Sequence, residues 1–208
     1  MIKVIEPKRL KLAVLASGRG SNFLAITEAI QTGKLNADIC LLISDKEHAP
    51  ALSRAEDAGI PALFIDPRKY SSREEYETEI IKKLNALDID IVVLAGYMRL
   101  VGKVLLDAYK MRIINIHPAL LPSFTGLHAQ RQAVEYGVKF SGCTVHFVDP
   151  GMDTGPIIVQ TVVPVYSDDT EDSLSDRILA EEHRTYCQAL QLLAEGRVFL
   201  KGRTVHIN

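Results

Sequence analysis

The sequence predicts an α/β fold: a Rossmann-like, mostly parallel central sheet flanked by helices in a single domain. Short continuous apolar runs alternate with segments of helical periodicity, which is the pattern of βαβ units. A glycine-rich turn follows the first apolar run, where folds of this class bind phosphate groups. No internal repeat, low-complexity tract or linker interrupts the 208 residues, a length that suits one α/β domain or at most two small ones.

The first part of the chain is expected to hold three buried strands and two helices. Each strand is a short apolar run, and the first helix shows Phe23, Ile26 and Ile30 at helical spacing before Gly33 ends it. We place the strands at residues 12–16, 39–43 and 62–65, and the helices at about residues 23–32 and 48–58.

The rest of the chain continues this alternation. Ser72 and Glu75 form a capping-box pattern that opens a helix with Tyr76, Ile80 and Leu84 on its apolar face. Further strands are expected at residues 89–95, 113–116, 141–148 and 157–165. A loop should span residues 120–126, followed by a short helix to about residue 136, a long amphipathic helix at about 171–194 and a terminal hairpin within 198–207.

The composition limits the classes of function. The net charge is -2, and only short basic clusters such as Lys8-Arg9 occur, so we expect no nucleic-acid partner. We find no signal-peptide pattern and no apolar run near 18 residues, and therefore expect no membrane association and a cytoplasmic location. Cys40, Cys143 and Cys187 are isolated, as is typical of a reducing compartment. Residues 1–9 should form a short extension, for which disorder is one option, and residues 10–208 the domain.

Three polar side chains lie at or beyond the carboxyl ends of predicted strands: Asn115, His117 and Asp153. The first two are two positions apart, which puts both side chains on one face of an extended segment. An amide can donate to a developing oxyanion, an imidazole can shuttle a proton, and a carboxylate can hold the imidazole. The trio therefore indicates acyl chemistry. Taken singly, His117 could also be a packed imidazole bonded to a loop carbonyl, and Asp153 a turn-forming residue.

The turn from Ser17 to Asn22 favours a phosphate-bearing substrate. Its glycines let the backbone approach a phosphate, and the next helix presents free N–H groups there. The Gly-Lys-Ser/Thr ending of a Walker A loop is missing. Phe23 replaces the third glycine of the dinucleotide pattern, so a nicotinamide site with Asp45 as its ribose acid stays an alternative, as does a plain tight turn. The histidines lack the spacing of metal ligands, and we expect no metal.

With these residues assembled, the chain resembles the phosphoribosylglycinamide formyltransferase family from about Leu10 to Arg203. The motifs that carry the resemblance occur in order at Ser17–Asn22, Ala95–Leu100, Asn115–Pro122 and Gly142–Val148 running on to Asp153–Pro156. Members of this family transfer a formyl group from 10-formyltetrahydrofolate to glycinamide ribonucleotide in purine synthesis. The resemblance implies a formyltransferase fold and these two substrates, with a monomer or homodimer left open. Tyr97 stands where Phe is frequent, and the nine leading residues are extra.

Carried over by position, the resemblance implies a role for each matching residue. The catalytic residues would be Asn115, His117 and Asp153. The ribonucleotide would contact Gly20, Ser21, Asn22, Leu179, Ala180, Glu181 and Glu182. The formyl-folate would contact Arg73, Met98, Arg99, Leu100, Val101, Asp149, Pro150, Gly151 and Met152, together with Asn115 and Asp153. The N-terminal half would thus bind the phosphate and the C-terminal half complete the folate and catalytic site.

Glu182 has independent support from helical spacing. It shares a stripe with Leu174, Ile178, Tyr186 and Leu190, so it should face inward. A carboxylate among apolar residues costs several kcal/mol unless it is paired, which favours a polar partner such as substrate hydroxyls or an amine. A glutamate at the edge of the core that reaches solvent or an arginine is the alternative.

Other functions stay open at this stage. A methionyl-tRNA formyltransferase would carry an additional C-terminal domain, and a formyltetrahydrofolate hydrolase an additional N-terminal regulatory domain. A nicotinamide-binding oxidoreductase would need the third glycine and a site for hydride transfer. A non-catalytic module that senses a ribose phosphate would leave the three inward polar groups unexplained.

Overall fold

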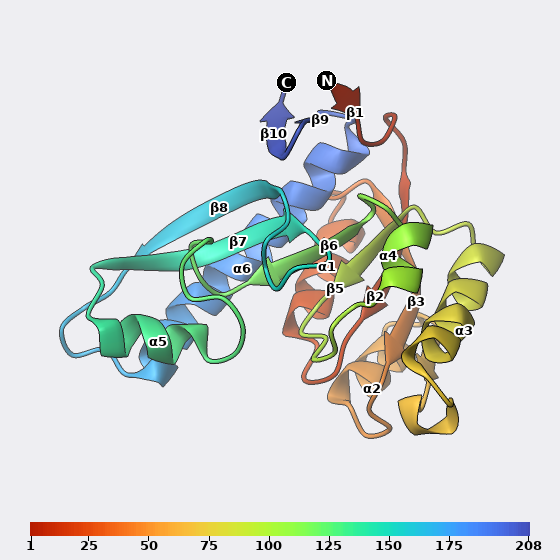
Figure 1. Ribbon diagram of the computed structural model, residues 1–208, viewed down its shortest axis with the longest axis horizontal. Helices are drawn as coiled ribbons and strands as arrows, with labels where there is room; N and C mark the ends of the chain where they lie inside the picture. Colours follow the sequence, from red (N-terminus) through yellow and green to blue (C-terminus); the bar gives the residue numbers. More distant parts are fainter.

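The computed structural model describes all residues, 1–208, and places a seven-stranded sheet at the centre of the molecule (Figure 1). The strand order is β4-β3-β2-β5-β6-β7-β8. The first five strands are parallel, and β7 and β8 run antiparallel to their neighbours. The strands span Leu10–Leu15 (β2), Ala37–Ser44 (β3), Ala62–Phe64 (β4), Ile91–Leu94 (β5), Ile113–His117 (β6), Phe140–Phe147 (β7) and Ile157–Pro164 (β8). The mostly parallel sheet predicted from the sequence is confirmed.

Helices cover both faces of this sheet because its strands are apolar on both sides. In β2, Leu12 and Val14 join one core cluster, and Ala13 and Leu15 join the other. The first face packs against α1 (Ser21–Gln31), α2 (Pro50–Asp57), α5 (Ala129–Tyr136) and α6 (Glu171–Ala194). The second packs against α3 (Arg73–Ala86) and α4 (Lys103–Ala108). The helix α4 has no counterpart among the elements expected from the sequence.

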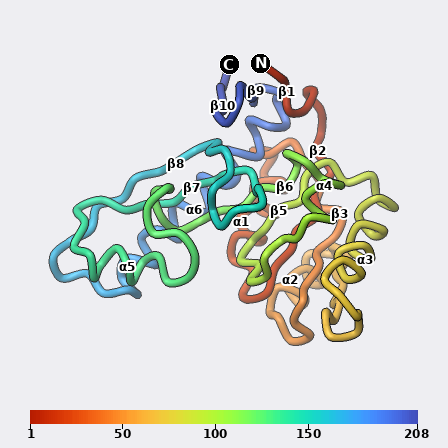
Figure 2. Tube along the Cα trace, in the orientation of Figure 1, coloured from red at the N-terminus to blue at the C-terminus, as the bar shows by residue number.

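The two chain termini lie together in a small separate sheet (Figure 2). Strand β1 (Ile2–Lys3) pairs with β9 (Val198–Lys201), which also forms the expected terminal hairpin with β10 (Thr204–Ile207). Disorder of residues 1–9 is therefore wrong as an option, because β1 finds a partner strand almost two hundred positions away that the local sequence does not reveal. None of the helices combines the length and apolar character needed to cross a membrane.

Candidate active site

A cleft of about 780 Å³ opens at the carboxyl ends of β2, β5 and β6, where parallel sheets bind ligands. Its walls come from the glycine turn, the loop after β5, the end of β6, the segment before α5, the loop after β7 and one face of α6. Among the residues predicted for the site, it is lined by Gly20, Ser21, Asn22, Met98, Arg99, Leu100, Asn115, His117, Met152, Asp153, Leu179 and Glu182.

The glycine turn forms the N-terminus of α1 and requires glycine at position 20. Gly20 has a φ of +73°, and a Cβ placed on it would lie 2.8 Å from the Cβ of Ala51. No side chain caps this helix, so the backbone N–H groups of its first turn stay available to an anion at the cleft. The local geometry therefore suits a phosphate group.

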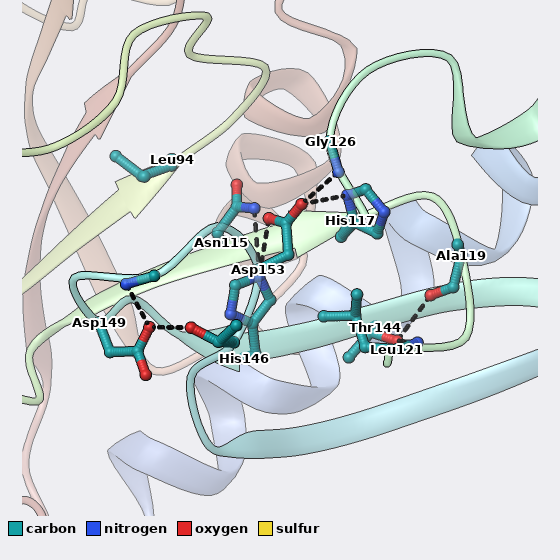
Figure 3. A network of polar contacts seen from close by, with 12 residues as sticks. Leu94, Asn115, His117, Ala119, Leu121, Gly126, Thr144, His146, Asp149 and Asp153 are labelled. Carbon is teal, nitrogen blue, oxygen red and sulfur yellow. Dashed lines mark hydrogen bonds and ion pairs between the residues drawn. The ribbon is translucent and has the colours of Figure 1, made fainter. Parts of the chain in front are cut away.

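Asn115, His117 and Asp153 lie together at the cleft (Figure 3). His117 Nδ1 is 3.4 Å from Asp153 Oδ2, and the N–H of Gly126 donates to the same oxygen at 2.8 Å. Asn115 and His117 are part of β6 itself and not of the segment beyond it, because the antiparallel partner β7 extends the strand pairing to His117. Their side chains share one face, as the two-residue spacing predicts.

The hydrogen bonds of His117 define which ring nitrogen serves the cleft. His117 Nε2 is 2.7 Å from the carbonyl oxygen of Phe124, and since a carbonyl only accepts, this nitrogen carries a hydrogen. Nδ1 is then the atom that faces Asp153. A hydrogen on Nδ1 would lie between the ring and the Asp153 carboxylate. His117 is buried, which shields this pair from bulk water.

His146 completes the polar cluster and is not among the site residues predicted from the sequence. Its Nδ1 donates to the carbonyl of Phe147 at 2.9 Å, which leaves Nε2 free to accept from Asn115 Nδ2 at 3.3 Å. Burial lowers the pKa of His146, so the neutral ring that this arrangement needs is favoured. The pairing of Asn115 with His146 across β6 and β7 is the signal that could have found it, once an antiparallel neighbour is assumed.

Asp149 shapes the loop that carries Asp153 and does not line the cleft. Asp149 Oδ1 accepts hydrogen bonds from the Gly151 N–H at 3.1 Å and from Thr154 Oγ1 at 2.6 Å. Its carboxylate is thus used within the turn. Pro150 and Gly151 belong to the same turn and also lie outside the cleft wall. Of the predicted residues 149–153, the structure brings only Met152 and Asp153 to the cleft.

On α6, only part of the predicted segment reaches the cleft. Leu179 and Glu182 are three positions apart and share the inner face of the helix. Ala180 and Glu181 point elsewhere for the same geometric reason, and Glu181 forms an ion pair with Arg184 on the outer side. The structure therefore does not place these two at the proposed ribonucleotide site.

Glu182 is a buried carboxyl group that contacts the glycine turn. Its Oε2 accepts a hydrogen bond from Asn22 Nδ2 at 2.9 Å, and 8% of the residue is exposed. Burial raises the Glu182 pKa to about 7, and the bond from Asn22 opposes this only in part. Asn22 Oδ1 is buried without a partner, so a protonated Glu182 could donate to it. The inward orientation predicted for Glu182 is confirmed.

The other side of the cleft has an apolar rim. Met98, Leu100, Leu127 and Met152 are large, exposed and line the cleft. A rim of this kind can cover a flat aromatic ligand. Two residues predicted for this side lie outside the wall: Val101 packs on the core cluster beneath α3 and α4, and the Arg73 side chain lies against Gly102.

This chain is similar to known formyltransferases in both sequence and structure. The formyl transferase family model matches residues 10–190. A phosphoribosylglycinamide formyltransferase of Bacillus subtilis is 44% identical over 183 residues, which are 88% of this chain and 94% of that protein. The trifunctional purine biosynthetic protein adenosine-3 of Drosophila melanogaster is 45% identical over 200 residues; the match covers 95% of this chain but 15% of that protein.

A solved structure agrees with these sequence matches. Glycinamide ribonucleotide transformylase 1 from Symbiobacterium toebii superposes with a TM-score of 0.93 at 50% sequence identity, over 95% of this chain and 93% of that one. The similarity thus extends over the elements that build the cleft, from β2 to α6.

Proposed function

The chain belongs to the formyl transferase family, and from this premise we propose that it transfers a formyl group from 10-formyltetrahydrofolate to the glycyl amine of glycinamide ribonucleotide. The products are formylglycinamide ribonucleotide and tetrahydrofolate, in the route of purine biosynthesis. The observation that carries this proposal is the meeting of Asn115, His117 and Asp153 in one cleft beside the free N-terminus of α1.

In the proposed reaction, the amine nitrogen attacks the formyl carbon and a tetrahedral intermediate with a developing oxyanion forms. Asn115 Nδ2 has two hydrogens; one is directed to His146, and the other can donate to the oxyanion. In this proposal a cationic His117, with its two N–H groups directed to Asp153 and to the Phe124 carbonyl, stabilises the oxyanion through its positive charge. The bond from the formyl carbon to the folate nitrogen then breaks, and the proton lost by the amine passes to that nitrogen.

Asp153 has two tasks in this proposal. Its Oδ2 stabilises the imidazolium of His117, and the Gly126 N–H fixes the orientation of the carboxylate. Its Oδ1 lies 3.7 Å from His146 Nε2 and is available to hold the water that carries the amine proton. No step of this sequence requires a metal.

The two substrates would enter from opposite sides of the trio. The phosphate of the ribonucleotide would bind the N–H groups at Gly20 to Asn22, with Glu182 close to its sugar or amine. The folate would lie under the apolar rim formed by Met98, Leu100 and Met152. We also propose a cytoplasmic location, which fits the three unpaired cysteines.

The test is a formyl-transfer assay with purified protein and both substrates, followed by the absorbance of the deformylated folate. Loss of one oxyanion donor typically costs about 3–4 kcal/mol, or 10² to 10³ in rate. Asn115→Ala, His117→Ala and Asp153→Ala should therefore each lower kcat at least about 100-fold while remaining folded. Release of formate without a ribonucleotide product would indicate a hydrolase instead. Near-normal turnover in His117→Ala would remove the role given to this residue.

A further inference from the structure

Asp45 is a buried carboxylate next to the cleft that the proposed reaction does not use. It follows β3 directly, 5% of the residue is exposed, and it does not line the cleft. Its Oδ1 lies 2.5 Å from the hydroxyl oxygen of Ser17, the first residue of the glycine turn motif. Lys46 Nζ is 4.0 Å from the other carboxylate oxygen. Burying a carboxylate is costly unless it is paired, so the contact with Ser17 should have a structural or functional purpose.

Ser17 connects the glycine turn with the loop after β5. Its backbone N–H donates to the carbonyl of Gly96 at 3.0 Å, and its Oγ accepts the backbone N–H of Met98 at 2.9 Å. Because a backbone N–H only donates and a carboxylate only accepts, the single hydroxyl hydrogen of Ser17 must point to Asp45. Asp45 thereby keeps the lone pairs of Ser17 directed at Met98.

The loop formed by residues 96–102 is held partly by side chains: Tyr97 and Val101 pack on the core cluster beneath α3 and α4, and the Tyr97 hydroxyl pairs with that of Tyr76 at 2.9 Å. Two of its apolar side chains, Met98 and Leu100, are more than half exposed at the rim of the cleft. Its far end is held by Glu77, whose carboxylate accepts the N–H groups of Gly102 and Leu105. At the near end, the backbone on both sides of Tyr97 is bonded to Ser17, through the Gly96 carbonyl and the Met98 N–H.

We propose that Ser17 and Asp45 are positioning residues for the folate side of the cleft, an inference that rests on the function proposed above. Asp45 orients the Ser17 hydroxyl, and the hydroxyl holds the Met98 amide, so that Met98 and Leu100 present their side chains to the folate. Neither residue touches the reacting atoms. Their loss should weaken folate binding selectively, because the N–H groups proposed to bind the phosphate belong to Gly20, Ser21 and Asn22.

Kinetics on three variants test this proposal. Ser17→Ala removes the hydroxyl, Asp45→Ala removes its acceptor, and Asp45→Asn is the matched control because its amide oxygen still accepts from Ser17. We expect the first two to raise KM for the folate at least tenfold, with KM for the ribonucleotide changed less than twofold. Asp45→Asn should return the folate KM to within about threefold of the wild type. Equal increases in both KM values, or none, would overturn the positioning role.

Hydrogen exchange provides a readout that does not depend on catalysis. The Met98 amide should be protected in the wild type and in Asp45→Asn, and should exchange at least tenfold faster in Ser17→Ala and Asp45→Ala at an unchanged melting temperature. An unprotected Met98 amide in the wild type would show that Ser17 does not hold it. If the wild type shows this protection but no formyl transfer, both the proposed function and the role in folate binding are wrong. The hydrogen bond from Ser17 to the Met98 amide would still be confirmed.

Discussion

Replacing Glu182 by glutamine should stabilise the protein at alkaline pH. The folded environment raises the pKa of this carboxyl from 4.5 to about 7 because it is buried. The folded state therefore binds more protons than the unfolded chain between these two values, and stability falls as the pH rises through them. At about 1.4 kcal/mol per pKa unit, the ionised group costs the folded state about 3 kcal/mol above pH 7.

The substitution removes this cost and keeps the shape of the side chain. The oxygen of the new amide could accept from Asn22 Nδ2 as the Glu182 carboxylate does, and one of its N–H groups could donate to the buried Asn22 Oδ1, which has no partner. The variant should therefore match the wild type most closely at acidic pH, where Glu182 is protonated in the folded state. At pH 8 we expect it to be more stable than the wild type.

Urea unfolding at pH 5 and pH 8 measures the effect. The free energy of unfolding of Glu182→Gln, relative to the wild type, should rise by about 2–3 kcal/mol between these two pH values. Glu181→Gln is the matched control, since it removes the same charge one position earlier, where the side chain pairs with Arg184 near the surface. A pH dependence equal in all three proteins would refute the reasoning. In the assay, Glu182→Gln should raise KM for the ribonucleotide, because the carboxylate faces that side of the cleft.

Three further predictions concern the cleft and its supports. Gly20→Val should weaken ribonucleotide affinity far more than folate affinity in calorimetry, because a Cβ there collides with Ala51 at a φ of +73°; equal loss of both would instead indicate local misfolding. Glu77→Ala should lower the free energy of unfolding by roughly 1–3 kcal/mol, measured in urea, because it leaves the N–H groups of Gly102 and Leu105 without a buried partner; an unchanged midpoint would contradict this. A chelator should leave the rate of formyl transfer unchanged, and a fall in rate that added metal restores would refute a metal-free mechanism.

Local patterns in the sequence were sufficient to predict most of the fold. The helix α6 begins and ends at the predicted residues, because a capping box at Thr170 and a long apolar stripe define it independently of the rest of the chain. Strand β1 and helix α4 were missed for the opposite reason. Strand β1 has two residues, too few to show a periodic pattern. Helix α4 has only six residues, and its N-terminus is held by Glu77 from another helix.

The candidate site shows the same division between local and distant information. Asn115 and His117 were placed correctly at the cleft because two-residue spacing within one strand fixes their common face. The predictions for Ala180 and Glu181 came from the resemblance alone, and helical geometry turns both away from the cleft. Asp149 lies outside the cleft wall because its carboxylate is used within its own turn, a contact that a list of matching positions does not reveal.

The antiparallel strand β7 explains why the trio can work as a unit. Without β7, β6 would be an edge strand, and Asn115 and His117 would have no neighbouring strand on that side. β7 brings His146 directly across from Asn115, and the loop after it returns Asp153 to His117. A slip of one residue in this pairing would turn His146 to the other face of the sheet and leave the Asn115 amide without its acceptor. The orientation of the Asn115 amide therefore depends on strand register, a property of the whole sheet that no short motif contains.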